Sequence, residues 1–358
     1  MSRQFVALDG MRGIAALLVV SLHLQPFFGG APFRSAYLAV DFFFALSGFV
    51  LAHAYGEKLA SGALSWSGFM RARLARLYPL YALGTALGFV VLVSGRMVGD
   101  EGGAPAGAYL VSALASVLFL PSPLSPNVNA FPFNFPAWSL FYELVVNALY
   151  AAAAPWLTNR ALWSVVGVAA ILLVGVSLAF DTVDLGARKE VFLGGVGRVL
   201  FAFFAGVAIH RLHRAWPAAR PVPFLVPIVL LLAVAGLGGA LAFDLFAVLV
   251  LVPLAVWLGA QARLGPRAAG VCAALGVSSY ALYAVHAPVL EALTRLVAKI
   301  GLSPSVGGAP LALALTAGLV GLSFLLERAY DRPVRAMLGR RPAVGANLED
   351  ARKGAPPR

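Results

Sequence analysis

The sequence predicts an all-α integral membrane protein, a bundle of ten transmembrane helices, from its composition, its hydropathy and the lengths of its apolar stretches. The 358 residues are 61% hydrophobic and 12% charged, with a mean hydropathy of +0.87. Charged residues make up about a quarter of an ordinary soluble domain, so that class is excluded. The single cysteine, Cys272, excludes an internal disulfide and a cysteine-based metal cluster.

Ten apolar stretches approach or exceed the roughly twenty residues that a bilayer requires. They lie at about 9–28, 36–56, 77–95, 138–157, 162–180, 193–211, 222–241, 243–260, 272–299 and 308–328. An eleventh stretch, 106–121, is shorter and leads into PSPLSPNVNAFPFNFP, whose five prolines prevent a continued helix. We therefore predict that 106–121 does not cross.

The distribution of positive charge supports ten spans. If 106–121 does not cross the membrane, most of the 27 lysines and arginines lie on the same side as the N-terminus, including those of RLHRAWPAAR and of the C-terminal tail. Cytoplasmic loops of membrane proteins carry such an excess. We predict a multi-pass protein of the cell inner membrane with both termini cytoplasmic. The net charge of +12 then requires no nucleic-acid partner.

Residues 106–137 form a long extracytoplasmic excursion that contains no charged residue. Irregular backbone at membrane depth is tolerated where it is buried in protein or lines a cavity. We predict a re-entrant or covering segment over a site; a surface hairpin in the headgroups is the alternative. Residues 1–335 make one membrane domain, and the polar, basic tail 336–358 is predicted to be disordered.

The first span, LDGMRGIAALLVVSLHLQP, carries three ionisable side chains: Asp9, Arg12 and His23. At 100° and 1.5 Å per residue, Arg12 and His23 share one helix face about 16 Å apart. Asp9 lies one turn before Arg12, where the two can form an ion pair. A topology anchor and an interfacial histidine would explain each residue separately. Their alignment is more typical of an interior site.

Two carboxylates enter the membrane from the predicted outer side. Asp41 opens the second span, and Glu143 lies about 7 Å deeper than the interfacial Trp138 in PAWSLFYELVVNALY. A helix cap for Asp41 and a buried pair with an arginine such as Arg198 for Glu143 are the structural alternatives. We expect both carboxylates near His23, because a carboxylate that orients an imidazole is the minimum for general base catalysis.

Four arginines lie at the cytoplasmic level. Arg71, Arg73 and Arg76 stand in FMRARLARLYPLY before the third span, and Arg12 lies at a similar depth. A basic loop beside a span can be a topology signal alone. The planar guanidinium is also well suited to phosphate oxygens, so a phosphorylated ligand is predicted to bind there.

The stretch SSYALYAVHAPVLEAL places His286 at mid-membrane, with Tyr283 one turn earlier on the same face and Pro288 just beyond. A satisfied polar pair inside the bundle is one interpretation. Binding of a substrate, or a second proton transfer, is the other.

Five stretches in this order resemble the acyltransferase 3 family of polytopic membrane acyltransferases. They are LDGMRG with Arg12 and His23, DFFFALSGFVLAHAYG, Arg73 and Arg76 before LYPLY, PAWSLFYE with Glu143, and SSYALYAVHAP with His286. The resemblance implies transfer of an acyl group, commonly acetyl, from acyl-CoA as co-substrate to a hydroxyl of an extracytoplasmic glycan or similar acceptor. It implies a catalytic His23 and a donor held by the arginines, with no permanently bound cofactor or metal.

The residues alone leave two further possibilities. A transporter or flippase would use the same intramembrane polar groups, although we find no inverted repeat in the sequence. Within the enzyme interpretation, a covalent acyl-histidine is the variant ranked second to direct transfer.

Overall fold

The computed structural model describes residues 5–30, 32–97, 104–216, 221–301, 303 and 307–339. These residues are almost entirely helical; the exception is a parallel pair of two-residue strands, β1 (Val222–Pro223) and β2 (Ala262–Arg263). The prediction of an all-α membrane fold is confirmed. Of the tail predicted at 336–358, residues 336–339 end helix α14, and the remainder lies outside the described residues.

The α-helices are α1 (Val6–His23), α2 (Gln25–Phe28), α3 (Ala39–Ala60), α4 (Trp66–Met97), α5 (Ala106–Val117), α6 (Ala137–Ala153), α7 (Asn159–Phe180), α8 (Gly195–Ala215), α9 (Leu225–Leu237), α10 (Leu241–Phe246), α11 (Val252–Gln261), α12 (Pro266–Lys299), α13 (Gly308–Leu326) and α14 (Arg332–Gly339). Short 3-10 turns occupy Ala36–Leu38, Ala154–Trp156 and Lys189–Gly194. Two π-helical turns occupy Ala247–Leu251 and Glu327–Asp331.

Nine helical segments of the described chain are long and apolar enough to cross a membrane. The tenth predicted span, 222–241, is shorter than expected: α9 has 13 residues, because Pro221 and Pro223 precede it and Gly238 and Gly239 follow it. It still runs between the two ends of the bundle, since β1 before it pairs with β2 after α11. Near its other end, the carbonyl of Ala235 accepts a hydrogen bond from the backbone N–H of Ser35, ahead of α3.

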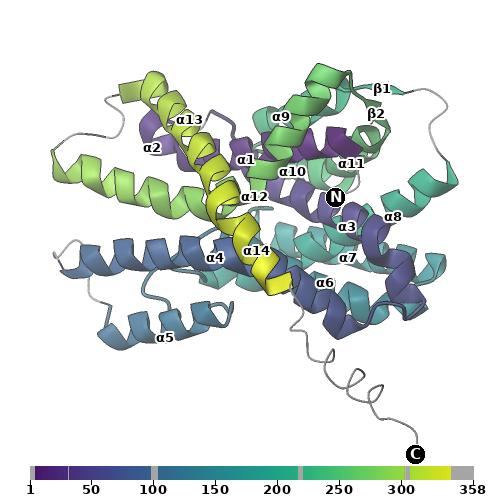
Figure 1. Cartoon of the computed structure of the whole chain (residues 1–358), viewed down its shortest axis with the longest axis horizontal. Helices are drawn as coiled ribbons and strands as arrows, with labels where there is room; N and C mark the ends of the chain where they lie inside the picture. Colours follow the sequence, from purple (N-terminus) through teal and green to yellow (C-terminus); the bar gives the residue numbers. More distant parts are fainter. Residues whose placement is uncertain are drawn as a thin grey trace, which may run out of the picture.

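The proline-rich excursion packs into the protein rather than crossing. Its helix α5 has 12 residues and lies alongside α4 (Figure 1). Beyond it, the Phe119 ring stacks on Tyr81 at 3.7 Å, and the Asn134 side chain donates to the backbone oxygen of Ala284 at 3.0 Å. Residues 118–136, the covering segment, therefore pack against both α4 and α12.

Two helix pairs set the register of the bundle. α1 lies along α12, and α3 lies along α8, with α13 and α14 crossing the front of α12 and α4 as one long diagonal helix (Figure 1). In the second pair, a Cβ on Gly48 would overlap the backbone oxygen of Phe203, and one on Gly206 would overlap that of Ala45. Small residues permit this close backbone contact between helices.

Cysteine labelling tests the predicted sidedness. A membrane-impermeant maleimide applied to whole cells should modify Leu124→Cys and Asp184→Cys, which replace exposed side chains, and should not modify Ala215→Cys at the opposite end. All three belong in a background in which the buried Cys272 is replaced by alanine. Ala215→Cys should become reactive after permeabilisation. Labelling of Ala215→Cys in intact cells would overturn the assignment of cytoplasmic ends.

Candidate active site

A cavity of about 970 Å³ opens inside the bundle between α1, α3, α4, α6 and α12. Its basic lining side chains outnumber its acidic ones: Arg12, Lys58, Arg73, Arg76 and Arg335 against Asp9, Glu143 and Glu327. Phe43 and Tyr283 also line the cavity, and their rings pack against each other at 5.4 Å. A volume of this size suits a large organic ligand. The excess of guanidinium groups favours an anionic one.

The side chain of Arg12, on α1, is bound by residues of its own helix and of α12. Its Nη2 lies 3.0 Å from Asp9 Oδ1, which confirms the pairing predicted from their spacing. The same nitrogen donates to the backbone oxygen of Gly276 at 2.7 Å, and Nε donates to Ser279 Oγ at 3.0 Å. α12 thereby fixes the guanidinium at the cavity surface.

On α6, Glu143 faces the arginines rather than His23. Its Oε1 accepts hydrogen bonds from Arg73 Nη2 at 2.7 Å and from Ser47 Oγ at 2.9 Å. The expected approach of Glu143 to His23 is therefore corrected, and so is its alternative pairing with Arg198. The reason is the position of Glu143 along α6: it lies six residues after the start of the helix at Ala137, where α6 lines the cavity.

Arg76 belongs to a charged network that sequence reasoning missed. Its Nη1 lies 3.2 Å from Asp331 Oδ2, and Arg335 Nη2 lies 2.8 Å from both Asp331 Oδ2 and Glu327 Oε1. The acidic side chains are almost fully buried in a π-helical turn, a form of helix that is frequent at functional sites. The signal was present in the sequence, as carboxylates at 327 and 331 followed by Arg335 at the end of the last span.

Three of the four predicted arginines meet in the cavity, and the fourth does not. Arg12, Arg73 and Arg76 line it, whereas Arg71 is exposed on α4 and stands outside the lining. Side chains two residues apart on a helix point about 200° apart, which explains why Arg71 and Arg73 lie on different sides of α4.

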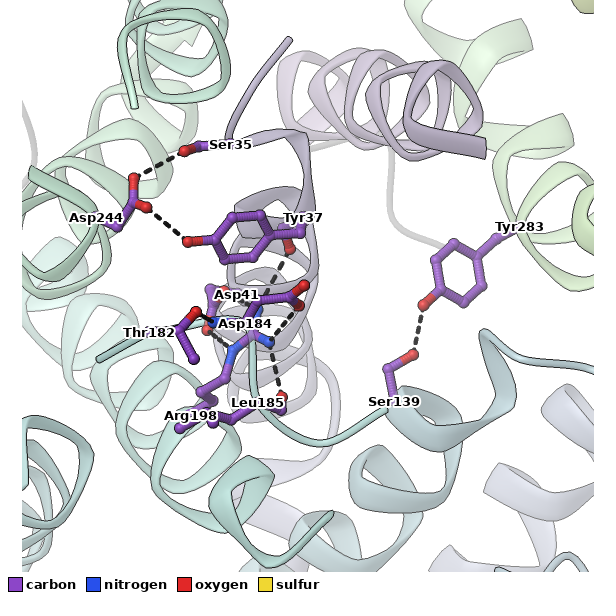
Figure 2. Close-up of polar contacts among 10 residues, drawn as sticks. All are labelled: Ser35, Tyr37, Asp41, Ser139, Thr182, Asp184, Leu185, Arg198, Asp244 and Tyr283. Atoms are coloured by element: carbon purple, nitrogen blue, oxygen red, sulfur yellow. Dashed lines mark hydrogen bonds and ion pairs between the residues drawn. The ribbon is translucent and has the colours of Figure 1, made fainter. Parts of the chain in front are cut away.

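Asp41 is fully buried and is paired with Arg198 (Figure 2). Its two oxygens accept from Arg198 Nη2 at 2.5 Å and Nε at 3.1 Å, a bidentate ion pair. Arg198 also donates to the backbone oxygens of Leu185 at 2.9 Å and Tyr37 at 3.3 Å. The expectation that Asp41 would join His23 is corrected, because the Arg198 guanidinium binds both oxygens of this carboxylate.

Trp138 and Tyr283 also differ from expectation. Trp138 is 4% exposed, and its ring lies over the Arg198 guanidinium at 5.3 Å, so it packs inside the bundle rather than at an open interface. The Tyr283 hydroxyl forms a hydrogen bond with Ser139 Oγ at 2.5 Å (Figure 2), rather than the expected one with His286. The Tyr283 ring lies between the cavity and His286, 5.9 Å from the imidazole.

His23 and His286 meet in space from α1 and α12. His23 Nδ1 lies 3.3 Å from His286 Nε2, and the two ring centroids are 4.8 Å apart. Phe135 of the covering segment packs against the His23 ring at 5.4 Å. Within the described chain, neither Asp41 nor Glu143 is bonded to His23; a second imidazole occupies the place expected for a carboxylate. Nor do the described residues include a cluster of three ligands suited to a metal ion.

Comparison with known proteins identifies relatives of this chain. A family model of an acyltransferase domain, Acyl_transf_3, matches residues 5–328. Protein 2 in the picA locus of Rhizobium radiobacter is 43% identical over 190 residues, covering 49% of this chain and 96% of that protein. Acyltransferase MdmB of Streptomyces mycarofaciens is 28% identical, and the match covers 98% of this chain and 96% of that protein. Exopolysaccharide production protein ExoZ of Rhizobium meliloti (strain 1021) is 28% identical, and the match covers 86% of this chain and 93% of that protein. No solved structure matches.

Proposed function

Because this chain belongs to the acyltransferase 3 family and is a membrane-embedded transferase, we propose that it moves a short acyl group, acetyl in the first instance, from cytoplasmic acyl-CoA to a hydroxyl of an extracytoplasmic glycan. The name of one relative, an exopolysaccharide production protein, supports the acceptor class, and the name of another, an acyltransferase, supports the reaction. The enzyme class is shown by the family. The donor, the acyl group and the acceptor are the proposal.

The observation that carries the proposal is an arginine-lined cavity that is also lined by Tyr283, whose ring lies 5.9 Å from His286 of the histidine pair. Arg12, Arg73 and Arg76 would bind the phosphates of the donor near the cavity mouth. The thioester arm would then extend toward Phe43 and Tyr283, beyond which lie the imidazoles. In this arrangement the acyl group crosses the membrane while the nucleotide stays on the cytoplasmic side.

The transfer step uses His23 as a general base. Its imidazole takes the proton of the acceptor hydroxyl as the hydroxyl oxygen attacks the thioester carbonyl carbon. The carbon–sulfur bond then breaks, and the leaving thiolate takes that proton from His23, so the histidine ends as it began. A covalent acyl-histidine remains the second route. A transporter or flippase is not favoured, because the family is one of transferases.

Donor binding is tested with arginine variants that have a matched control. Arg73→Ala and Arg76→Ala should each weaken acetyl-CoA binding to the purified protein in nanodiscs by roughly 10-fold or more, since each removes a charge-assisted bond of about 1.5–3 kcal/mol. Arg71→Ala, on the same helix but outside the cavity, should bind normally. Calorimetry with acetyl-CoA and with acetyl-pantetheine, which lacks the nucleotide phosphates, measures both.

The phosphate-free analogue decides between ligand binding and structure. If the arginines contact phosphate, their loss should hardly change the affinity for acetyl-pantetheine. Equal losses for both ligands would show that Arg73 and Arg76 only support the fold. Release of coenzyme A thiol, accelerated by a polysaccharide acceptor, tests the reaction itself; no turnover of acetyl-CoA under any condition would refute the proposed donor.

A further inference from the structure

His286 presents a lone pair to His23, and its hydrogen bonds show which nitrogen carries it. His286 Nδ1 lies 2.9 Å from the backbone oxygen of Tyr283 and 3.1 Å from that of Leu282. Carbonyl oxygens only accept hydrogen bonds, so the proton of the neutral ring sits on Nδ1. Its Nε2, the atom 3.3 Å from His23, is therefore an acceptor.

The same argument then assigns the proton on His23. Its Nδ1 faces two acceptors, the backbone oxygen of Val19 at 2.9 Å and His286 Nε2 at 3.3 Å. If Nδ1 of His23 were unprotonated, its lone pair would face those of the Val19 oxygen and of His286 Nε2, with no hydrogen atom between any of the three. The proton therefore belongs on Nδ1, and Nε2 of His23 is left unprotonated and able to accept a proton.

The local fold holds His286 in this orientation. Pro288 has no backbone N–H, so the oxygen of Ala284 loses its helical partner, and the side chain of Asn134 donates to it instead at 3.0 Å. A Cβ on Gly84 would overlap this oxygen, so glycine is required where α4 passes the bond. The helix turn that carries His286 is thus tied to the covering segment, and His286 itself is fully buried.

From this geometry we propose that His286 is a positioning residue: it holds His23 in the Nδ1-protonated tautomer and keeps Nε2 as the base. It acts through His23 and does not contact the cavity that would hold the donor. When His23 accepts a proton on Nε2, its Nδ1–H continues to donate to His286, so the imidazolium is formed without any rearrangement. The inference rests on the proposed role of His23 and adds the group that makes one nitrogen of it basic.

The magnitude follows from comparison with other histidine bases. Forcing the wrong tautomer in a serine protease triad costs about 10⁴ in kcat. Here Val19 supplies a second acceptor for the same proton, so a smaller loss is expected. The closer comparison is the partner that orients a metal-bound histidine, whose loss typically costs roughly 10–100-fold. We expect His286→Leu to lower kcat by roughly 10–100-fold with the KM for acetyl-CoA nearly unchanged, because His286 does not line the cavity proposed to hold the donor.

The experiment compares His286→Leu with His286→Gln in nanodiscs. The side-chain oxygen of glutamine can replace Nε2 as the acceptor for His23, so His286→Gln should recover most of the lost kcat, whereas a role in packing alone would not discriminate the two variants in this way. Solid-state NMR of ¹⁵N-histidine protein, with His23→Gln used to assign its signals, should show protonated Nδ1 for His23 in the wild type and mixed tautomers in His286→Leu.

Two results would overturn the proposal: a normal kcat in His286→Leu, or equal losses in the Leu and Gln variants. The double variant His23→Gln/His286→Leu separates this failure from that of the proposed function. It should be no slower than His23→Gln alone, because groups acting as one unit are not additive. If His23→Gln itself transfers normally, the base assignment fails first; if it is inactive while His286→Leu is normal, only the positioning role fails.

Discussion

Substitution of His23 by glutamine is expected to abolish most acyl transfer while leaving the protein folded and able to bind its donor. Glutamine is of similar size and polar, and His23 is only partly buried, so α1 should still pack along α12. Loss of a general base typically lowers the rate by roughly 10²–10⁴. Transfer of radiolabelled acetyl to polysaccharide measures the rate, and calorimetry with acetyl-CoA measures binding.

His53→Gln is the matched control for this prediction. His53 lies near the opposite end of α3, where its ring packs against Phe5 and His210 and away from the cavity lining. It should transfer at close to the wild-type rate. If His23→Gln retained that rate as well, the chemistry would have to be assigned elsewhere, and His286 would be the next residue to examine as the base.

Replacement of Arg198 by methionine is expected to destabilise the protein strongly. Both members of its ion pair with Asp41 are 0% exposed, so the variant leaves a carboxylate buried without its partner. Breaking a buried pair in this way typically costs about 3–5 kcal/mol of folding free energy. Replacing both groups with apolar residues, as in Asp41→Leu/Arg198→Met, should recover most of that loss, because no buried charge then remains.

Arg214→Met is the control, since Arg214 is also on α8 and also pairs with a carboxylate of α3, Glu57. Those side chains are 61% and 79% exposed, and a surface pair contributes about 0–1 kcal/mol. Thermal unfolding in detergent compares these variants with the wild type. A stable Arg198→Met protein that binds donor but cannot transfer would instead place Arg198 in the chemistry.

The sequence alone predicted most of the fold and the part of the site that lies within single helices. Hydropathy located nine of the helical spans, and five prolines kept 106–121 from becoming another. Hydropathy overestimated the length of α9, because it averages over a stretch and does not resolve the glycines at which this helix ends. The Asp9–Arg12 pair was predictable because residues three apart on a helix are neighbours whatever surrounds them.

Partners on different helices were decided by the tertiary structure. The sequence supplied Asp41, Glu143 and His286 as polar residues within spans, but Asp41 went to Arg198, Glu143 to Arg73 and His286 to His23. These pairings depend on how far each helix is shifted and rotated against its neighbours. Apolar side chains carry little information about that register, because lipid and protein are equally apolar surroundings for them. Backbone contacts at glycines such as Gly48 set it instead, and they exist only once the helices are packed.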